Sequence, residues 1–422
     1  MFQLTETRKR WLLIICMFYV AFVFLMHKWG HQGDMEFWID WSKYIFNYGF
    51  VHVYDNKNCN YLPLYLYVLR FHTVIQGNLQ DIQDNMYTIK YYTIIFDIIG
   101  AYLAVWFVKD EFKKLFYFVL LMLNVAYFYN TALWAQVDAI FTCFGFCAII
   151  LALEKKTVLS ALSLLIALNF KLQALVFIPI VGLILLPQLI SKEGIKKIVI
   201  AALIGFVIQL LILWPFISND RMYQVMNVIT GSVDKYPYPA VGAFNLWSLL
   251  LFNRTIEGMY DITDKVKFGF LTYKQIGSLL FFLGTFIAVF PLMQHLYKKY
   301  IKKEITSFPL STIFLIAALI AFNFYFLNTQ MHERYFHPAM ISLAAYAFYS
   351  GRFFPFILGS VAYLINLERV CWYLAMHNDT YMKSFWMDQR FVAFLYLILM
   401  LFMYYLLYAK KRNSENDIEL DI

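Results

Sequence analysis

The chain has 422 residues, of which 62% are hydrophobic, 20% aromatic and only 15% charged, and its formal net charge is +8. This composition excludes an ordinary soluble globular protein. Lysines in loops that face anionic lipid account for the positive charge, and no segment resembles a nucleic-acid-binding module.

Apolar segments recur along the whole chain at lengths suited to a bilayer. A hydrocarbon core of roughly 30 Å requires about 20 apolar residues per helix, and backbone groups in lipid must bond internally, as in helices or barrels. The long apolar runs lack the alternation of barrel strands. We therefore predict one all-α, polytopic membrane domain over residues 1–422 with about twelve transmembrane helices, at 11–27, 88–108, 114–131, 138–153, 157–170, 172–190, 196–216, 274–296, 307–327, 337–350, 353–369 and 390–409.

The distribution of basic residues predicts the orientation of these helices. The first apolar run, 11–27, is followed by the bulky residues Lys28 and Trp29 and not by a small-residue cleavage site. We therefore expect a retained span and not a signal peptide. The basic segments fall on one side, which is then cytoplasmic and holds both termini. These segments are 8–10, 109–114, 154–156, 192–197, 298–303 and 410–412.

The apolar stretch 157–190 is too long for one membrane crossing and short for two. Asn169, Lys171 and Gln173 interrupt it near the middle. A lysine at the bilayer centre costs roughly 2.5–3.5 kcal/mol on insertion scales. We therefore predict a helix break there, with Lys171 at the outer face.

Two long segments, 28–87 and 217–273, are predicted to lie on the outer face, and the first contains interfacial helices. Cys59 and Cys371 fall in predicted outer loops and could pair. Two triplets fit glycosylation acceptors, Asn253-Arg254-Thr255 and Asn378-Asp379-Thr380. The polar tail 413–422 is expected to fray.

Asp34 and Glu36 follow the first predicted span, on the outer face. Each is either a solvated surface carboxylate or part of a site. In the second case Asp34 suits a general base, which removes a proton from an attacking hydroxyl and contributes typically 10²–10⁴ in rate. Nearby tryptophans, Trp41 among them, favour the interface and offer a wall for a sugar ring.

Other polar groups gather at the same predicted face. Trp134, Gln136 and Asp138 follow the third span as polar caps or as part of a site. Lys171 is either a paired structural lysine or a phosphate ligand, because a lysine among apolar neighbours normally has a partner. His332 and Arg334 form an interfacial charge patch or a phosphate site, since arginine binds phosphate as a fork. Phe336 occupies the position where a zinc HExxH motif needs its second histidine.

In chain order these motifs resemble the GT-C glycosyltransferases, multispan enzymes that use polyprenyl-phosphate sugars. The likeness is greatest to dolichyl-phosphate-glucose-dependent glucosyltransferases and to bacterial mannosyltransferase-like members, and it extends to about residue 340. The motifs are Gly33-Asp34-x-Glu36 with Trp41, Asn60-Tyr61-x-Pro63-Leu64, Trp134-x-Gln136-x-Asp138, Asn169-Phe170-Lys171-x-Gln173 with Pro179, and His332-Glu333-Arg334. Asn60 and Leu62 depart from the family, which often has an acid before a Tyr-Pro-Pro run.

The resemblance implies an inverting hexosyltransferase with no metal cofactor, although a divalent cation stays possible. Asp34 is then the catalytic base, and Lys171, His332 and Arg334 lie by the donor phosphate. The donor or acceptor sugar is expected to contact Glu36, Trp41, Tyr61, Trp134, Gln136 and Asp138. The partners implied are a polyprenyl-phosphate sugar, a lipid-linked or cell-envelope glycan acceptor, and membrane lipids.

Other functions stay open at this point. The alternatives are a transporter or flippase of a lipid-linked saccharide, and a polysaccharide polymerase or ligase that uses a pyrophosphate-linked donor. The richness in Lys, Ile, Tyr and Phe favours a bacterial plasma membrane over the endoplasmic reticulum.

Overall fold

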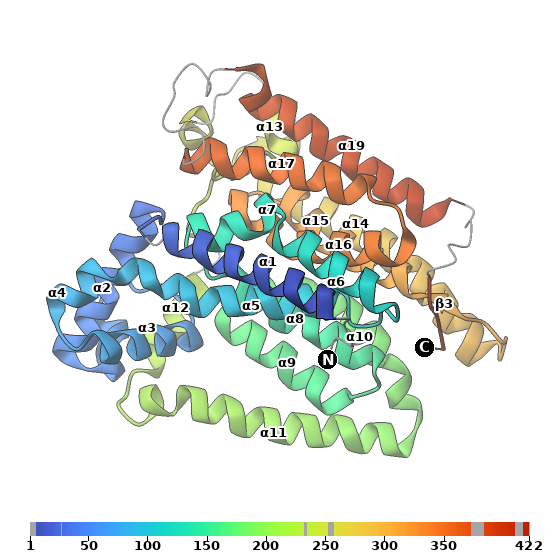
Figure 1. The fold of residues 1–422 in the computed structure, drawn as a ribbon, viewed down its shortest axis with the longest axis horizontal. Helices are drawn as coiled ribbons and strands as arrows, with labels where there is room; N and C mark the ends of the chain where they lie inside the picture. Colours follow the sequence, from blue (N-terminus) through green and yellow to red (C-terminus); the bar gives the residue numbers. More distant parts are fainter. Residues whose placement is uncertain are drawn as a thin grey trace.

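Helices make up nearly all of the regular structure of this chain (Figure 1). The structure, a computed structural model, describes residues 6–26, 28–231, 234–251, 257–372, 384–409 and 417–421. The main α-helices are α1 (Glu6–Leu25), α2 (Gln32–Tyr48), α3 (Pro63–Gln76), α4 (Leu79–Asp84), α5 (Lys90–Ala104), α6 (Glu111–Met122), α7 (Val125–Phe128), α8 (Asp138–Leu153), α9 (Thr157–Phe170), α10 (Ile178–Leu185), α11 (Lys192–Ile217), α12 (Met222–Gly231), α13 (Leu246–Leu250), α14 (Tyr273–Leu296), α15 (Leu310–Leu327), α16 (His337–Ser350), α17 (Phe354–Cys371) and α19 (Gln389–Tyr408). The predicted all-α class is confirmed.

Short helical segments and strands join these helices. Two of the segments are π-helices, η3 (Tyr129–Leu133) and η7 (Tyr297–Ile301). The 3₁₀ segments are η1 (Phe50–Asp55), η2 (Met86–Ile89), η4 (Leu172–Phe177), η5 (Leu186–Ile190), η6 (Glu257–Asp261), η8 (Glu333–Phe336) and η9 (Phe385–Met387). The strands β1 (Lys267–Phe268) and β2 (Leu271–Thr272) pair antiparallel, as do β3 (Phe308–Pro309) and β4 (Glu419–Leu420).

Six helical segments of the described residues are long and apolar enough to cross a membrane, which indicates a membrane protein. A seventh is added if the bent pair Glu111–Met122 and Val125–Leu133 counts as one span. The six are Leu172–Ile190, Lys192–Ile217, Tyr273–Ile301, Leu310–Leu327, Phe354–Cys371 and Gln389–Tyr408. Each corresponds to one of the spans predicted from the sequence.

The prediction of about twelve spans is therefore wrong, because the other apolar runs form shorter or bent helices. α9 and α16 have 14 residues each, and at 1.5 Å per residue each rises only about 21 Å. The predicted span at 114–131 bends by 55° between α6 and α7. The runs at 88–108 and 138–153 also yield apolar helices shorter than 18 residues.

The centre of the molecule consists of helices that are apolar on every side. Nearly every side chain of α15 and of α16 is buried. A helix that is hydrophobic all round lies either in lipid or among other helices, and the burial of these side chains in the structure shows the second case. α16 is therefore an interior helix, packed against α15, α17 and α8.

The predicted helix break at Lys171 is confirmed. α9 ends at Phe170, and Lys171 has extended backbone angles (φ −154°, ψ 137°) before η4 begins. The break lets the ammonium of Lys171 turn toward the other polar groups described below. The cost of leaving a charge inside an apolar helix is thereby avoided.

The two predicted outer segments lie together. α2, α3 and α4 occupy one end of the molecule (Figure 1), and α3 is delimited by Pro63 at its first turn and by Gly77 in the left-handed conformation (φ 73°). Arg221, from the second segment, lies 2.9 Å from a carboxylate oxygen of Asp55 in the first. This ion pair joins segments 28–87 and 217–273.

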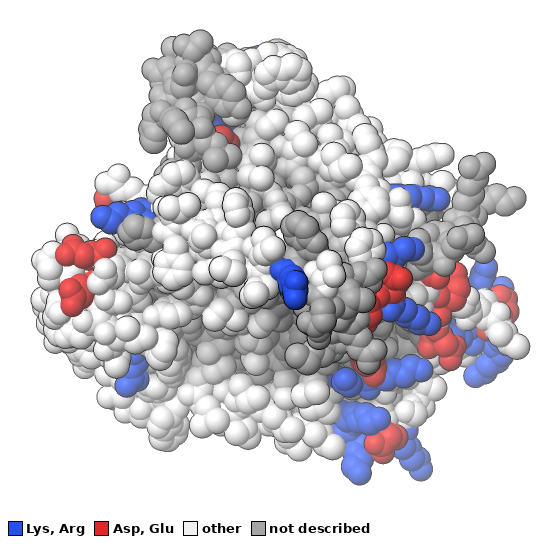
Figure 2. Space-filling model, in the orientation of Figure 1, with Lys and Arg blue, Asp and Glu red and all other residues white. Residues whose placement is uncertain are grey.

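Charged side chains on the face shown in Figure 2 gather mainly at the opposite end, near β3 and the C-terminus, and are sparse between the two ends. Contrary to the expected fraying of the tail, residues 417–421 are ordered there. Leu310 N donates to Ile418 O at 2.8 Å, and Lys299 pairs with Asp421 at 2.6 Å.

Two predictions about the outer loops have simple outcomes. Cys59 and Cys371 are both buried and both free, so they do not pair. The two glycosylation triplets lie outside the described residues.

Candidate active site

A cavity of about 390 Å³ lies where the segments 28–87 and 217–273 meet α14, η4 and η8. Its volume falls in the range of small-molecule sites, roughly 300–1,000 Å³. It is lined by six of the residues that the sequence analysis selected: Asp34, Trp41, Tyr61, Lys171, His332 and Arg334. Close to 300 residues of sequence separate the first from the last, and the fold brings them to one place.

Asp34 lies on the first turn of α2, and three side chains contact one of its carboxylate oxygens, Oδ2. Trp134 Nε1 donates to Asp34 Oδ2 at 2.9 Å and Gln136 Nε2 donates to it at 2.6 Å. His31 Nδ1 lies 2.9 Å from the same oxygen. Burial by itself raises the pKa of Asp34, but the hydrogen bond with His31 and the charge of Arg334 outweigh it and hold the pKa well below its ordinary value. The carboxylate is therefore ionised.

The local backbone explains how Trp134 and Gln136 reach the same oxygen. They follow the π-helix η3, and Ala135 between them has a left-handed conformation (φ 68°). Such a conformation is costly for a residue other than glycine, and π-helical turns recur at functional sites. His31 N donates to Trp134 O at 3.0 Å and ties this turn to the start of α2.

Lys171, on the cavity wall, forms a buried ion pair with Asp138, which does not line the cavity. Lys171 Nζ lies 2.6 Å from Asp138 Oδ1, and the side chains are 10% and 0% exposed. Arg334 Nε lies 3.8 Å from the other oxygen, Asp138 Oδ2. Three rings lie within 6 Å of the Lys171 ammonium, those of Tyr61, Phe141 and Tyr335. Of the two readings left open for Lys171, the paired lysine fits this geometry.

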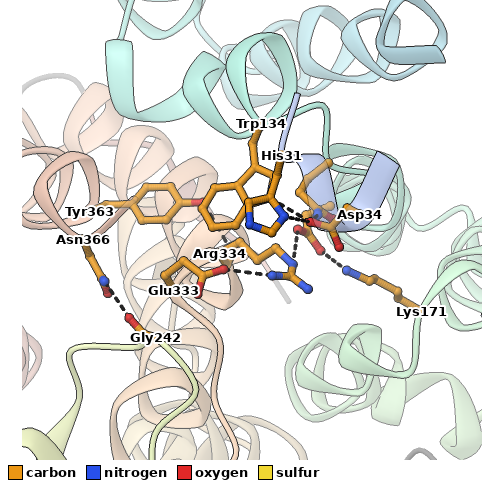
Figure 3. Close-up of polar contacts among 11 residues, drawn as sticks. His31, Asp34, Trp134, Lys171, Gly242, Glu333, Arg334, Tyr363 and Asn366 are labelled. Atoms are coloured by element: carbon orange, nitrogen blue, oxygen red, sulfur yellow. Dashed lines mark hydrogen bonds and ion pairs between the residues drawn. The ribbon is translucent and has the colours of Figure 1, made fainter. Parts of the chain in front are cut away.

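His332 and Arg334 also line the cavity. Arg334 NH1 donates to Glu333 Oε1 at 2.8 Å, and its guanidinium lies 5.7 Å from the ring centroid of Trp134. Burial and the charge of Arg334 lower the pKa of His332 well below its ordinary value. The imidazole is therefore neutral and presents one N–H donor. Figure 3 shows Asp34 of α2, Lys171 from the break between α9 and η4, and the η8 neighbours Glu333 and Arg334 converging.

The residues predicted to contact sugar separate into two groups. Trp41 and Tyr61 line the cavity with their rings 5.2 Å apart. Trp134, Gln136 and Asp138 are buried and do not line it. They lie behind Asp34 and Lys171, where they hold those two side chains in place. Glu36 is exposed, accepts a hydrogen bond from Gln32 at 3.0 Å and is not part of the cavity wall.

The sequence analysis missed several residues of the site. His31 contacts Asp34, and Lys235, Tyr236, Lys274 and Gln330 line the cavity. One signal could have revealed the lysines, because the positive-inside rule makes cations in an outer segment unusual. Lys235 and Lys274 lie in or next to the predicted outer segment 217–273.

Lys90 is a further residue that no motif revealed. It is fully buried, and its ammonium donates to Met26 O at 2.7 Å, to Ala132 O at 2.8 Å and also to Trp29 O. These carbonyls belong to the end of α1, the approach to α2 and the π-helix η3. Lys90 therefore joins the three segments that position Asp34.

Within the described ranges, no three His, Cys, Asp or Glu side chains are grouped so as to hold a metal ion. No protein-family model matches the chain, and no curated protein is significantly similar to it.

Proposed function

We propose that this protein transfers a hexose, with inversion, from a polyprenyl-phosphate donor to a hydroxyl of a lipid-linked or cell-envelope glycan at the outer face of a membrane. The observation that carries the proposal is one cavity lined by an ionised aspartate, Asp34, and by cationic side chains that include Arg334. A base and a phosphate site facing each other are what a displacement at a sugar phosphate requires.

In the proposed reaction, Asp34 removes the proton from the acceptor hydroxyl. The hydroxyl oxygen forms a bond to the anomeric carbon, and the bond from that carbon to the phosphate oxygen breaks. Polyprenyl phosphate leaves with the electron pair. Since all described donors to Asp34 act on Oδ2, Oδ1 is the oxygen that we assign to the acceptor.

Because of Arg334, binding of the donor phosphate is expected to change the basicity of Asp34. Its charge lowers the pKa of Asp34, and a carboxylate with a low pKa is a weak base. A phosphate bound at Arg334 would offset that charge, so the pKa of Asp34 would rise toward its ordinary range. Asp34 would then be a stronger base with the donor in place than in the empty site.

Apolar residues on the same cavity wall suit a lipid-linked donor. Leu172, Leu175, Val228 and Phe324 line it, and Leu175 is 53% exposed. Leu175 belongs to the candidate span Leu172–Ile190, and Ser278, on the cavity wall, to the span Tyr273–Ile301. A donor with its phosphate in the cavity would have its chain next to these apolar surfaces.

The test is transfer from synthetic polyprenyl-phosphate hexoses by the purified protein. Asp34→Asn is expected to lower kcat by about 10²–10⁴, while the matched control Asp40→Asn, exposed on the same helix, keeps full activity. The proposed reaction uses side-chain cations at the phosphate, so a chelator is expected to leave the rate unchanged. Near-normal turnover by a correctly inserted Asp34→Asn variant contradicts the mechanism, as does saccharide transport into empty proteoliposomes without any transfer.

A further inference from the structure

Most cations around the cavity already have a carboxylate partner. Lys171 lies 2.6 Å from Asp138 Oδ1, and Arg334 NH1 lies 2.8 Å from Glu333 Oε1. Lys274 pairs with Asp234. Each of these charges is balanced before any ligand binds, so a phosphate gains less from them than their number suggests.

Lys235 is different. It lines the cavity and is exposed. In the part of the chain that the structure describes, no carboxylate oxygen lies within 4.0 Å of its ammonium. The ammonium lies 5.2 Å from the ring centroid of Tyr236. Partial burial against the cavity wall and the charge of Arg334 lower the pKa of Lys235, and the charge of Asp34 raises it. Lys235 lines the same cavity as Asp34 and Arg334, the two groups that the proposed reaction uses.

The segment that carries Lys235 is held by hydrogen bonds to residues 330 and 331. Gln330 N donates to Tyr238 O at 2.9 Å, and Val241 N donates to Met331 O at 2.9 Å. On the other side of Lys235, Gln330 Nε2 donates to Asp234 Oδ1 at 3.0 Å. Lys235 therefore extends from a backbone fixed on both sides, next to His332 and Arg334.

We infer that Lys235 binds the phosphate of the donor lipid, and that Lys171 serves to neutralise Asp138. The inference rests on the proposed function and assigns the phosphate to a different lysine than the sequence motifs did. A phosphodiester carries one negative charge, and Lys235 supplies one unbalanced positive charge. Arg334 and the neutral His332 add hydrogen-bond donors to the same phosphate.

The experiment measures equilibrium binding of farnesyl phosphate to the purified full-length protein, with farnesol as the uncharged probe. Lys235→Met is expected to weaken farnesyl phosphate binding by roughly 10- to 100-fold, the range for one charged hydrogen bond, and to leave farnesol binding unchanged. Lys235→Arg is expected to retain most of the affinity. Lys265→Met is the matched control, since Lys265 is exposed in the same outer segment and does not line the cavity.

Two results overturn the inference: wild-type affinity of Lys235→Met for farnesyl phosphate, or an equal loss of affinity for farnesol. The binding assay needs no turnover, so it separates this inference from the proposed function. Binding that depends on Lys235, together with undetectable transfer from any polyprenyl-phosphate hexose, supports the phosphate site and refutes the transferase. Normal transfer with Lys235-independent binding does the reverse.

Discussion

The indole of Trp134 donates a 2.9 Å hydrogen bond to the carboxylate of Asp34, which lies 100 residues earlier in the chain. Trp134 is buried, and Asp34 lines the cavity. The pair therefore connects the interior of the helix bundle with the group that we assign to proton removal.

Removing this hydrogen bond is expected to change the pH dependence of transfer. Trp134→Phe deletes the donor to the ionised form of Asp34, so the pKa of Asp34 rises. Because a base acts only when it is ionised, the fall of kcat/KM toward acid pH should then begin at a higher pH than in the wild type. At neutral pH Asp34 is ionised in both proteins, and we expect the loss of its positioning to outweigh its greater basicity and to lower kcat/KM by roughly tenfold.

The matched control is Trp106→Phe, since the indole of Trp106 also donates to a carboxylate, that of Glu154 at 3.1 Å, away from the cavity. It should leave the pH profile unchanged. An unshifted acid limb in Trp134→Phe contradicts the positioning role.

Ala135 is expected to tolerate glycine and not a β-branched residue. Its positive φ of 68° is strained for alanine, free of strain for glycine and far more costly for valine. Ala135→Gly should keep transfer within about twofold of the wild type. Ala135→Val should displace Trp134 and Gln136 and lower transfer by more than tenfold, as misplaced catalytic groups do. Equal activity of the two variants would show that this backbone conformation is not needed.

Lys90→Met is expected to destabilise the protein strongly. It removes the ammonium that donates to the carbonyls of Met26 and Ala132, and a buried group left unsatisfied costs about 1–3 kcal/mol. The apparent melting temperature in detergent should fall by many degrees, whereas Lys28→Met, at an exposed position nearby, should leave it unchanged. A melting temperature like that of the wild type would show that the hydrogen bonds of Lys90 do not stabilise the protein.

The Lys171–Asp138 pair is expected to show compensation. Asp138→Leu leaves Lys171 as an unpaired buried charge, and breaking a buried pair costs about 3–5 kcal/mol. The double variant Lys171→Met/Asp138→Leu removes both charges and should recover most of the lost stability, as read from the melting temperature and the monodisperse fraction. Additive losses in the double variant would mean that the two side chains do not act as a pair.

The number of spans illustrates what a sequence window cannot decide. The apolar composition of 114–131 fits one span, yet Asn124 caps a new helix by accepting from Tyr127 N at 3.1 Å, and the axis bends by 55°. The run at 337–350 is apolar enough for a span, but it forms a 14-residue helix surrounded by protein. An apolar run shows only that a segment is kept away from water. Helices that contact lipid and helices that are buried among other helices both have such runs.

The sequence by itself determined the helical class, the membrane character and the break at Lys171, because these follow from local composition and from the cost of placing a charge in an apolar helix. It also selected residues that the fold gathers in one cavity. Only the tertiary structure decided which of them face that cavity, which lie behind it, and that Lys171 is balanced by Asp138 while Lys235 is not. The physical reason is that charge pairing and burial depend on side chains brought together from distant parts of the chain. A local sequence pattern does not specify which distant side chains come into contact.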